Sequence, residues 1–319
     1  MTSPKIFIVV LQYNNSEDTI RCLESLKELD WRDFRVIVVD NASEIQHLNS
    51  IRLFIENQSR AKRGHTASPR GFVRDKGEGG VKFYFLVNRQ NLGYAGGNNI
   101  GIRYALEEGA DYILILNPDT TVKSDSLTKL VETAEKNPKA GIIGAMVDEG
   151  DRVINCGKVK WLKPELKHSV LQTKNYKLQT NQYIPGVAML VHRDVFKEIG
   201  LFDERYFLYF EDVDFCIGAQ KAGFKLVVAP KALIHHHPSS STSKLGAASL
   251  LYYHYRNAHL FNSKNAPFWV KILLPFWSIW IIIKQTAKIL LGINVQVSKA
   301  ILRGVLDFYK GRFGKISNF

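Results

Sequence analysis

The feature that most constrains the fold of this chain is a repeated alternation of short apolar runs with longer segments that carry one apolar face. The β-rich apolar runs lie at residues 5–11, 34–39, 82–87 and 111–116. After the first run, a helix is predicted to begin at Ser16, because apolar side chains recur there every three or four positions. The order strand, helix, strand, helix predicts a parallel β-sheet in an α/β fold.

The polar residues at the ends of these runs are the first candidates for a binding site. Parallel sheets bind ligands beyond the carboxyl ends of their strands, and Tyr13 and Asp40 both fall there. A turn rich in Gly and Asn follows the third run, at residues 88–101, where its use would be close approach of backbone to a ligand. A dinucleotide-binding fingerprint belongs after the first strand instead, so a dehydrogenase fits poorly.

The fourth run ends in Asn117-Pro118-Asp119, which places an acid at the tip of a strand apolar enough to be central. Such an acid is well placed to hold a divalent cation against a diphosphate. A plain turn uses the same residues, so both interpretations stay open. The basic stretch at residues 60–80 is likewise either a solvated loop or a loop that grips a phosphate.

Three carboxylates, Glu211, Asp212 and Asp214, fall within four positions directly after an aromatic run at residues 206–210. Acids in the first turn of a helix complement its free N–H groups and its dipole. An apolar wall beside clustered acids is also how a site raises the basicity of one carboxylate. The motif alone supports a structural and a catalytic interpretation equally.

Further apolar runs at residues 141–147, 183–191 and 225–228 predict additional strands, and residues 151–181 are expected to be irregular. Beyond the last run, three adjacent histidines occupy positions 235–237. Side chains alternate along an extended strand. Either the outer two histidines or the central one alone therefore points inward.

Positive charge is concentrated at the C-terminal end, where residues 244–319 carry eleven Lys or Arg against one acid. An aliphatic run with three tryptophans, at residues 267–284, argues against nucleic acid and for an anionic membrane surface as the partner. Only twelve residues separate Lys271 from Lys284, fewer than the ~20 needed to cross a bilayer. We expect an interfacial or re-entrant helical segment; packing on the preceding α/β part of the chain or a homodimer interface is the alternative.

The three cysteines, Cys22, Cys156 and Cys216, lie far apart and predict no disulfide framework. The first apolar run is too short for a secretion signal. Both observations lead us to expect a cytoplasmic protein.

Five motifs occur in a fixed order: Val38-Val39-Asp40-Asn41-Ala42-Ser43, Asn91-Leu92-Gly93-Tyr94-Ala95-Gly96-Gly97-Asn98, Leu116-Asn117-Pro118-Asp119-Thr120, Gly200-Leu201-Phe202-Asp203-Glu204 and Phe210-Glu211-Asp212-Val213-Asp214. Together they resemble glycosyltransferase family 2, and in particular its rhamnosyltransferase-like branch, over roughly residues 4–262. The resemblance implies a GT-A fold, a Rossmann-like fold of nucleotide-diphospho-sugar transferases. It implies a catalytic domain at 1–243, with a nucleotide-sugar-binding half at 1–122 and an acceptor half at 123–243, followed by basic amphipathic helices at 244–319.

The resemblance also implies roles in donor binding. Tyr13 and Asp40 would hold the base, by packing and by accepting its imide N–H. Asp119 would bind a divalent cation, Mn²⁺ or Mg²⁺, together with His236, or else with His235. Asn117 replaces the first acid of the family's DXD metal motif, which removes one anionic ligand. The implied donor-binding residues are Tyr13, Asp40, Asn41, Asn91, Gly93, Gly97, Asn98, Asn117 and Asp119.

The implied reaction is an inverting transfer. Asp212 would be the catalytic base that takes the proton of the acceptor hydroxyl as its oxygen attacks the anomeric carbon, and Glu211 and Asp214 would bind the acceptor. The expected donor is dTDP-L-rhamnose or a related hexose. The expected acceptor is a lipid-linked saccharide of cell-surface polysaccharide or glycan synthesis, at the cytoplasmic face of the membrane. A UDP-sugar donor carrying glucose, galactose, an amino sugar or galactofuranose, or a non-catalytic sugar-nucleotide-binding scaffold, is the alternative.

Overall fold

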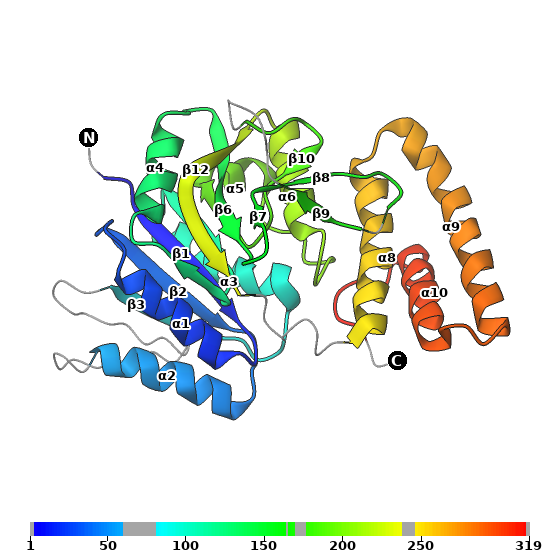
Figure 1. Ribbon diagram of the computed structural model, residues 1–319, viewed down its shortest axis with the longest axis horizontal. Coiled ribbons are helices and arrows are strands. Elements are labelled where there is room, and N and C mark those ends of the chain that lie inside the picture. Colours follow the sequence, from blue (N-terminus) through cyan, green and yellow to red (C-terminus); the bar gives the residue numbers. More distant parts are fainter. Residues whose placement is uncertain (1–2, 60–80, 164, 170–176, 238–245, 317–319) are drawn as a thin grey trace.

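The computed structural model describes residues 3–59, 81–163, 165–169, 177–237 and 246–316 (Figure 1). The basic stretch at 60–80 and the predicted domain boundary at 243/244 lie outside these residues. A nine-stranded sheet forms the centre, in the order β3-β2-β1-β4-β11-β6-β12-β5, with β7 paired to β6.

The four predicted strands of the N-terminal third form the parallel part of this sheet. They are β1 (Ile6–Gln12), β2 (Phe34–Asp40), β3 (Lys82–Val87) and β4 (Tyr112–Leu116). Because their carboxyl ends share one edge, the polar residues that follow them gather there.

The other half of the sheet is mixed. Its strands are β5 (Thr120–Val122), β6 (Ala140–Asp148), β7 (Val153–Ile154), β11 (Ala188–His192) and β12 (Lys225–His236). The strand β11 lies antiparallel between β4 and β6, and β5 is antiparallel to β12, while β6 and β12 pair in parallel. The predicted parallel pairing is therefore confirmed for the first four strands and for β6 with β12, but not for β11 or β5. The run predicted at 225–228 continues as one strand, β12, into the histidines, and β12 pairs with β6 and β5.

Helices cover both faces of the sheet, as the alternation of side chains along each strand requires. Phe7, Val9 and Leu11 of β1 face one hydrophobic cluster, which includes residues of α3 (Gly93–Glu107), α5 (Arg193–Ile199) and α6 (Glu211–Lys221). The residues between them face a second cluster, under α1 (Ser16–Lys27), α2 (Ile45–Ser59) and α4 (Ser126–Glu135). The result is a three-layered α/β/α domain.

Part of the segment expected to be irregular forms a second, small sheet. Its strands are β8 (Cys156–Lys158), β9 (Lys167–Ser169) and β10 (Gln182–Tyr183), in the order β10-β8-β9. This sheet matters for the site, because β9 brings a histidine to it.

Three helices follow the domain: α8 (Gly246–Asn265), α9 (Phe268–Leu290) and α10 (Val295–Tyr309). Figure 1 shows α8 nearest the domain and α9 outermost. By length and composition, α9 is the one helix of the described chain that could cross a membrane. The helix has 23 residues and contains both Lys271 and Lys284. The sequence argument counted only the residues between these two lysines and therefore underestimated the length of the apolar helix.

Candidate active site

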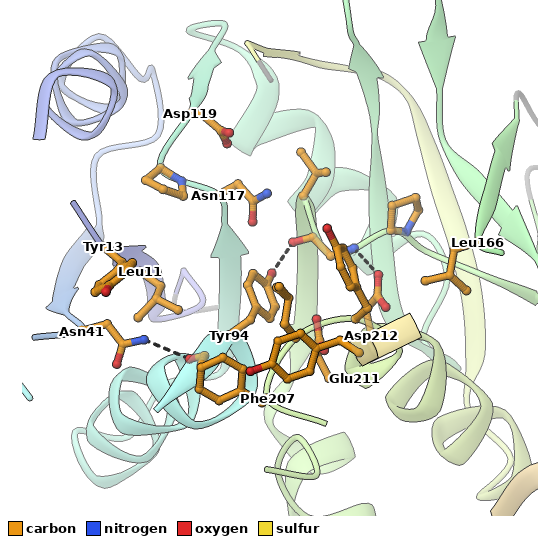
Figure 2. Close-up of a pocket in the computed structure, with 18 of the residues that line it drawn as sticks. Leu11, Tyr13, Asn41, Tyr94, Asn117, Asp119, Leu166, Phe207, Glu211 and Asp212 are labelled. Atoms are coloured by element: carbon orange, nitrogen blue, oxygen red, sulfur yellow. Dashed lines mark hydrogen bonds between the residues drawn. The ribbon is translucent and has the colours of Figure 1, made fainter. Parts of the chain in front are cut away.

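A cavity of about 580 Å³ opens at the carboxyl ends of β1 and β4 (Figure 2). Segments from the whole length of the chain line it, including the start of α3, the turn after β4, the first turn of α6 and the region after α10. Its lining residues include Leu11, Tyr13, Asn41, Asn91, Gly93, Tyr94, Asn117, Asp119, Leu166, His168, Gly186, Phe207, Leu208, Tyr209, Glu211, Asp212, His236, Ser249, Tyr253, Lys315 and Ile316.

At one end of the cavity, Asn41 organises the predicted donor-binding turn. Its Nδ2 donates to Asn91 Oδ1 at 3.0 Å and to the Gly93 carbonyl at 3.1 Å. Its Oδ1 accepts from the Leu92 amide at 3.0 Å. Tyr13, at the same end, is 38% exposed. The turn is therefore fixed by side-chain hydrogen bonds, with an aromatic ring beside it that a base could stack on.

Three predicted donor-binding residues do not line the cavity. Asp40 is fully buried, and its carboxylate accepts from Gln12 Nε2 at 2.7 Å and from the Ser43 amide at 2.9 Å. Gly97 packs against Leu11: a Cβ atom added to Gly97 would lie only 2.5 Å from Leu11 Cδ1. The glycine therefore allows α3 to pack closely on β1. Asn98 donates to the Tyr94 carbonyl at 3.0 Å. These three residues therefore support the walls of the cavity, and their contact with a donor stays a prediction.

The pairing of β12 with β5 brings a histidine to the acid at the tip of β4. His236 is opposite Thr120 in this pairing, and its Nε2 lies 3.4 Å from Asp119 Oδ1. His235 points elsewhere, with its Nδ1 3.1 Å from Asp148 Oδ2. Of the two arrangements that strand alternation left open, the structure therefore has the one in which His236 faces the cavity.

The surroundings of His236 fit a divalent cation. Its Nδ1 lies 3.4 Å from Glu149 Oε1, and a carboxylate on one ring nitrogen leaves the other free to bind metal. Burial alone would lower the pKa of His236, but hydrogen bonding and charge from Asp119 and Glu149 raise it overall. Among the described residues, no group of three or more His, Cys, Asp or Glu side chains is arranged to hold a metal ion. Mg²⁺ sites commonly use one or two protein ligands and take the rest from substrate phosphates and water.

Across the cavity from Tyr13 and Asp119, the first turn of α6 presents two buried acids (Figure 2). Asp212 Oδ2 accepts from the Gly186 amide and Oδ1 from the Val213 amide, both at 2.8 Å. Burial raises the pKa of Asp212, although these two amides and nearby His168 oppose the rise. Burial and the Asp212 charge raise the pKa of Glu211 far above its ordinary value. The two backbone amides that donate to Asp212 favour its charged form, whereas burial beside that charge favours a proton on Glu211.

Asp214, predicted to bind the acceptor, lies outside the cavity. It is buried, 2.6 Å from Lys264 Nζ and 2.5 Å from Asn265 Nδ2, and it accepts from the Tyr206 hydroxyl at 3.2 Å. These contacts tie α6 to α8. The contacts of Asp214 therefore serve the packing of two helices, and acceptor binding by Asp214 stays a prediction.

The aromatic run before the acids forms a wall of the cavity, through Phe207 and Tyr209. Its backbone is in the left-handed region at Phe207, Tyr209 and Phe210, with φ of 64°, 69° and 76°. Such conformations cost of order 1–3 kcal/mol each for residues other than Gly. Strain concentrated directly before two acids marks this loop as part of the site.

Sequence reasoning missed several lining residues. His168, on β9, has an Nε2 with no hydrogen-bond partner among the described residues, and its edge lies against the ring of Tyr183. Nothing in the sequence around it signalled a strand. Ser249, Tyr253 and the residues after α10 were also missed, because their approach to the site depends on the packing of the C-terminal helices.

Comparison with known proteins identifies the family to which this chain belongs. A family model described as "Glycosyl transferase family 2" matches residues 7–200, and one described as "Glycosyl transferase family group 2" matches residues 112–311. Together the two models cover nearly all of the sheet, the three C-terminal helices and the lining of the cavity other than Lys315 and Ile316.

Three curated relatives carry activity names. The low-salt glycan biosynthesis hexosyltransferase Agl10 of Haloferax volcanii is 25% identical over 56% of this chain and 59% of its own. The N-acetylglucosaminyl-diphospho-decaprenol L-rhamnosyltransferase of Mycobacterium tuberculosis is 28% identical over 50% and 57%. The dTDP-rhamnosyl transferase RfbF of Shigella flexneri is 23% identical over 82% and 80%. The chain thus spans less than two thirds of the first two relatives.

Two solved structures share the fold. GalNAc-T7 with UDP, GalNAc and Mn²⁺ has a TM-score of 0.59 at 16% identity, over 79% of this chain and 47% of its own. The mannosyltransferase PcManGT of Pyrobaculum calidifontis, with GDP-Man and Mn²⁺, has a TM-score of 0.55 at 12% identity, over 98% and 89%. These neighbours confirm the predicted GT-A-like fold.

Proposed function

The chain belongs to glycosyl transferase family 2, and on this basis we propose that it transfers a sugar from a nucleotide-diphosphate donor to a lipid-linked saccharide, with inversion. The observation that carries the proposal is the placement of Asp212, a buried carboxylate with two amide donors, across one cavity from Tyr13, Asp119 and His236. Such a cavity is suited to hold a nucleotide at one end and to present a base at the other.

In the proposed reaction, Asp212 accepts the proton of the acceptor hydroxyl while the oxygen of that hydroxyl attacks the anomeric carbon of the donor sugar. The nucleoside diphosphate leaves from the opposite face of the sugar, so the configuration inverts. A cation held by Asp119 and His236 would neutralise charge on the leaving diphosphate. Glu211, kept protonated by burial beside Asp212, is able to donate a hydrogen bond to the acceptor.

The proposed donor is dTDP-L-rhamnose. Two of the relatives are named as rhamnosyl transferases, one of them with a dTDP donor. A UDP-sugar remains the alternative donor class, since the fold also occurs with UDP bound.

Calorimetric titration of the purified protein with dTDP, UDP and GDP, each with and without Mn²⁺, tests this proposal by measuring which nucleotide binds most tightly. We expect dTDP to bind most tightly and Mn²⁺ to strengthen its binding. A preference for UDP or GDP would retain the transferase and discard rhamnose. Binding of none of the three would contradict the donor site itself.

We further propose that the three C-terminal helices place the enzyme on the cytoplasmic face of a membrane, along the outer side of α9. The outer side of α9 carries exposed large apolar residues, and α9 belongs to the basic part of the chain. These residues include Phe268, Trp269, Ile272, Leu273, Phe276, Ile279, Trp280 and Ile283. Apolar and aromatic side chains with interspersed lysines are typical of a helix in the membrane interface.

The inner side of α9 supports lying on the membrane over crossing it. Ser278 and Gln285 are buried there, and Ser278 Oγ lies 3.0 Å from His259 Nε2 of α8 and 2.8 Å from the Tyr309 hydroxyl of α10. Burial lowers the pKa of His259 to about 4, so it is neutral at physiological pH. A helix held on one side by this polar network presents only its other side to lipid.

Replacing Trp269, Phe276 and Trp280 together by Glu is expected to weaken binding to vesicles that contain anionic lipid by at least about 100-fold. Each change removes an exposed apolar side chain worth about 1.5–3 kcal/mol when buried in lipid and adds a repelled charge. Vesicle co-sedimentation measures the effect. Glu at Ile45 and Leu53, which are exposed on α2, is the matched control and should change nothing. Unchanged vesicle binding with a loss of dimer in sedimentation would assign the face to a second copy.

A further inference from the structure

The loop formed by residues 205–210 sits between the two halves of the proposed chemistry. At one end, the Phe207 carbonyl accepts from the Tyr94 amide at 2.6 Å, next to the donor-binding turn. At the other end, Phe210 is the N-cap of α6, and its carbonyl accepts from the Asp214 amide at 2.8 Å. Any shift of this loop therefore moves Asp212, which is in the first turn of α6.

The loop would not keep its left-handed backbone conformations without external support, because residues other than Gly disfavour them. Its own carbonyl groups receive that support from α8. Asn257 Nδ2 donates to three of them, those of Tyr206 at 2.9 Å, Leu208 at 2.7 Å and Tyr209 at 3.0 Å. One buried side chain thus binds three carbonyl groups within four residues of the strained backbone.

Arg256 adds two further donors to the loop. Its Nη2 donates to the Tyr206 carbonyl at 2.9 Å and to the Arg205 carbonyl at 3.2 Å, while Nη1 donates to the Gly314 carbonyl at 2.7 Å. Arg256 Nε donates to Asn257 Oδ1 at 3.0 Å, which orients the amide so that its Nδ2 faces the loop. The two side chains act as one unit.

The burial of Arg256 indicates that its charge has a use beyond packing. The side chain is fully buried, with its guanidinium 5.3 Å and 5.1 Å from the ring centroids of Tyr252 and Tyr253. Removing a charge from water is costly, and an apolar side chain of similar volume would pack there without that cost. A planar fork of donors, however, matches an array of carbonyl groups.

We propose that Arg256 and Asn257 are positioning residues for transfer: from α8 they hold residues 205–210 in the conformation that aims Asp212 into the cavity. This inference rests on the proposed function for its catalytic consequence. It also makes the C-terminal helices a component of the active site, in addition to any role at a membrane.

The test compares Asn257→Leu with Asn262→Leu. Both residues are fully buried amides of α8, but Asn262 bonds to the Ala258 carbonyl and the Leu162 amide, away from the acids. With dTDP-L-rhamnose as donor and water as acceptor, we expect Asn257→Leu to lower kcat for dTDP release about 100-fold, because small displacements of a catalytic group cost that much. Its KM for the donor should stay within about threefold.

Asn262→Leu and Asn257→Leu should lower the Tm by similar amounts, but Asn262→Leu should leave kcat within about threefold of wild type. Arg256→Lys keeps the positive charge but loses the planar guanidinium, and its kcat should lie between those of wild type and Asn257→Leu. Equal kcat losses in the two leucine variants at equal Tm would overturn the inference, because the role would then be structural only.

Hydrogen exchange separates this inference from the donor assignment. Amides of residues 205–212 should exchange at least about tenfold faster in Asn257→Leu and not in Asn262→Leu. If wild type released no dTDP, the donor proposal would fail while the exchange result still decided the positioning role. Unchanged exchange at residues 205–212 in Asn257→Leu would overturn the inference whatever the donor.

Discussion

Asp212→Asn is expected to lower the rate of sugar transfer by at least about 10³-fold, within the range that a positioned general base contributes. The amide keeps the size of the side chain but cannot accept the proton of the acceptor hydroxyl. The Kd for dTDP should stay within about threefold of wild type, because Asp212 lies across the cavity from Tyr13 and Asp119. Transfer assays and calorimetry on the same preparation measure both quantities.

Loss of fold is tested by the Tm of the same preparation. Burial raises the pKa of Asp212 in the folded protein, so its ionisation above the unfolded pKa disfavours the folded state, and the Asn variant is free of that penalty. The variant keeps, however, only one acceptor oxygen for the Gly186 and Val213 amides, so the Tm is measured for each preparation and activity is compared at a temperature where both proteins are folded. Near-normal turnover in Asp212→Asn would contradict the assignment of the base.

The neighbouring acid provides the matched control. Burial and the charge of Asp212 raise the pKa of Glu211 far above its ordinary value, which favours its neutral form, and Glu211→Gln should therefore retain transfer within about tenfold. The pH profile adds a second check. Transfer in wild type should fall as the pH drops through the raised pKa of Asp212, at a higher pH than an exposed aspartate would give.

His236→Ala is expected to abolish most of the effect of Mn²⁺ on nucleotide binding, weakening dTDP binding in its presence by about 100-fold. The change removes one of the two ligands that we propose for the cation, Asp119 and His236, whose Oδ1 and Nε2 lie 3.4 Å apart. Binding measured with EDTA should differ little between variant and wild type. Calorimetry with and without metal gives the comparison.

His235→Ala is the control for this prediction, because that ring belongs to the same strand but contacts Asp148. It should keep the response to Mn²⁺. Equal loss in the two variants would mean that the strand, and not one imidazole, is required, and the assigned ligand pair would then be wrong.

Periodicity and residue type were enough to predict the strands that carry the site, because buried strands of a parallel sheet are nearly continuous apolar runs. They also placed Tyr13, Asp40 and Asp119 at one edge of the sheet. Alternation along a strand left two arrangements of the three histidines open, and only the family resemblance favoured His236. These predictions rest on local rules that hold wherever a regular strand forms.

The residues that do not line the cavity show what the sequence could not resolve. Asp40, Gly97 and Asn98 stand in the motifs of the site but lie behind its walls, and a short-range pattern does not distinguish a lining residue from the residue behind it. Asp214 follows Asp212 by two positions, which on a helix turns it by about 200°, toward α8. His168 and Tyr253 reach the cavity through tertiary packing that no local signal encodes.

The strand pairing that joins Asp119 to His236 also has a consequence for biosynthesis. These residues are separated by more than a hundred positions, and they meet only when β5, an edge strand of three residues, pairs with β12. Pairing between distant segments is slow to form and incurs the entropy of closing a long loop. A nascent chain should therefore have no complete cation site until the segment around residue 236 has left the ribosome. Cellular sugar nucleotide would then favour late, fully paired chains over early intermediates.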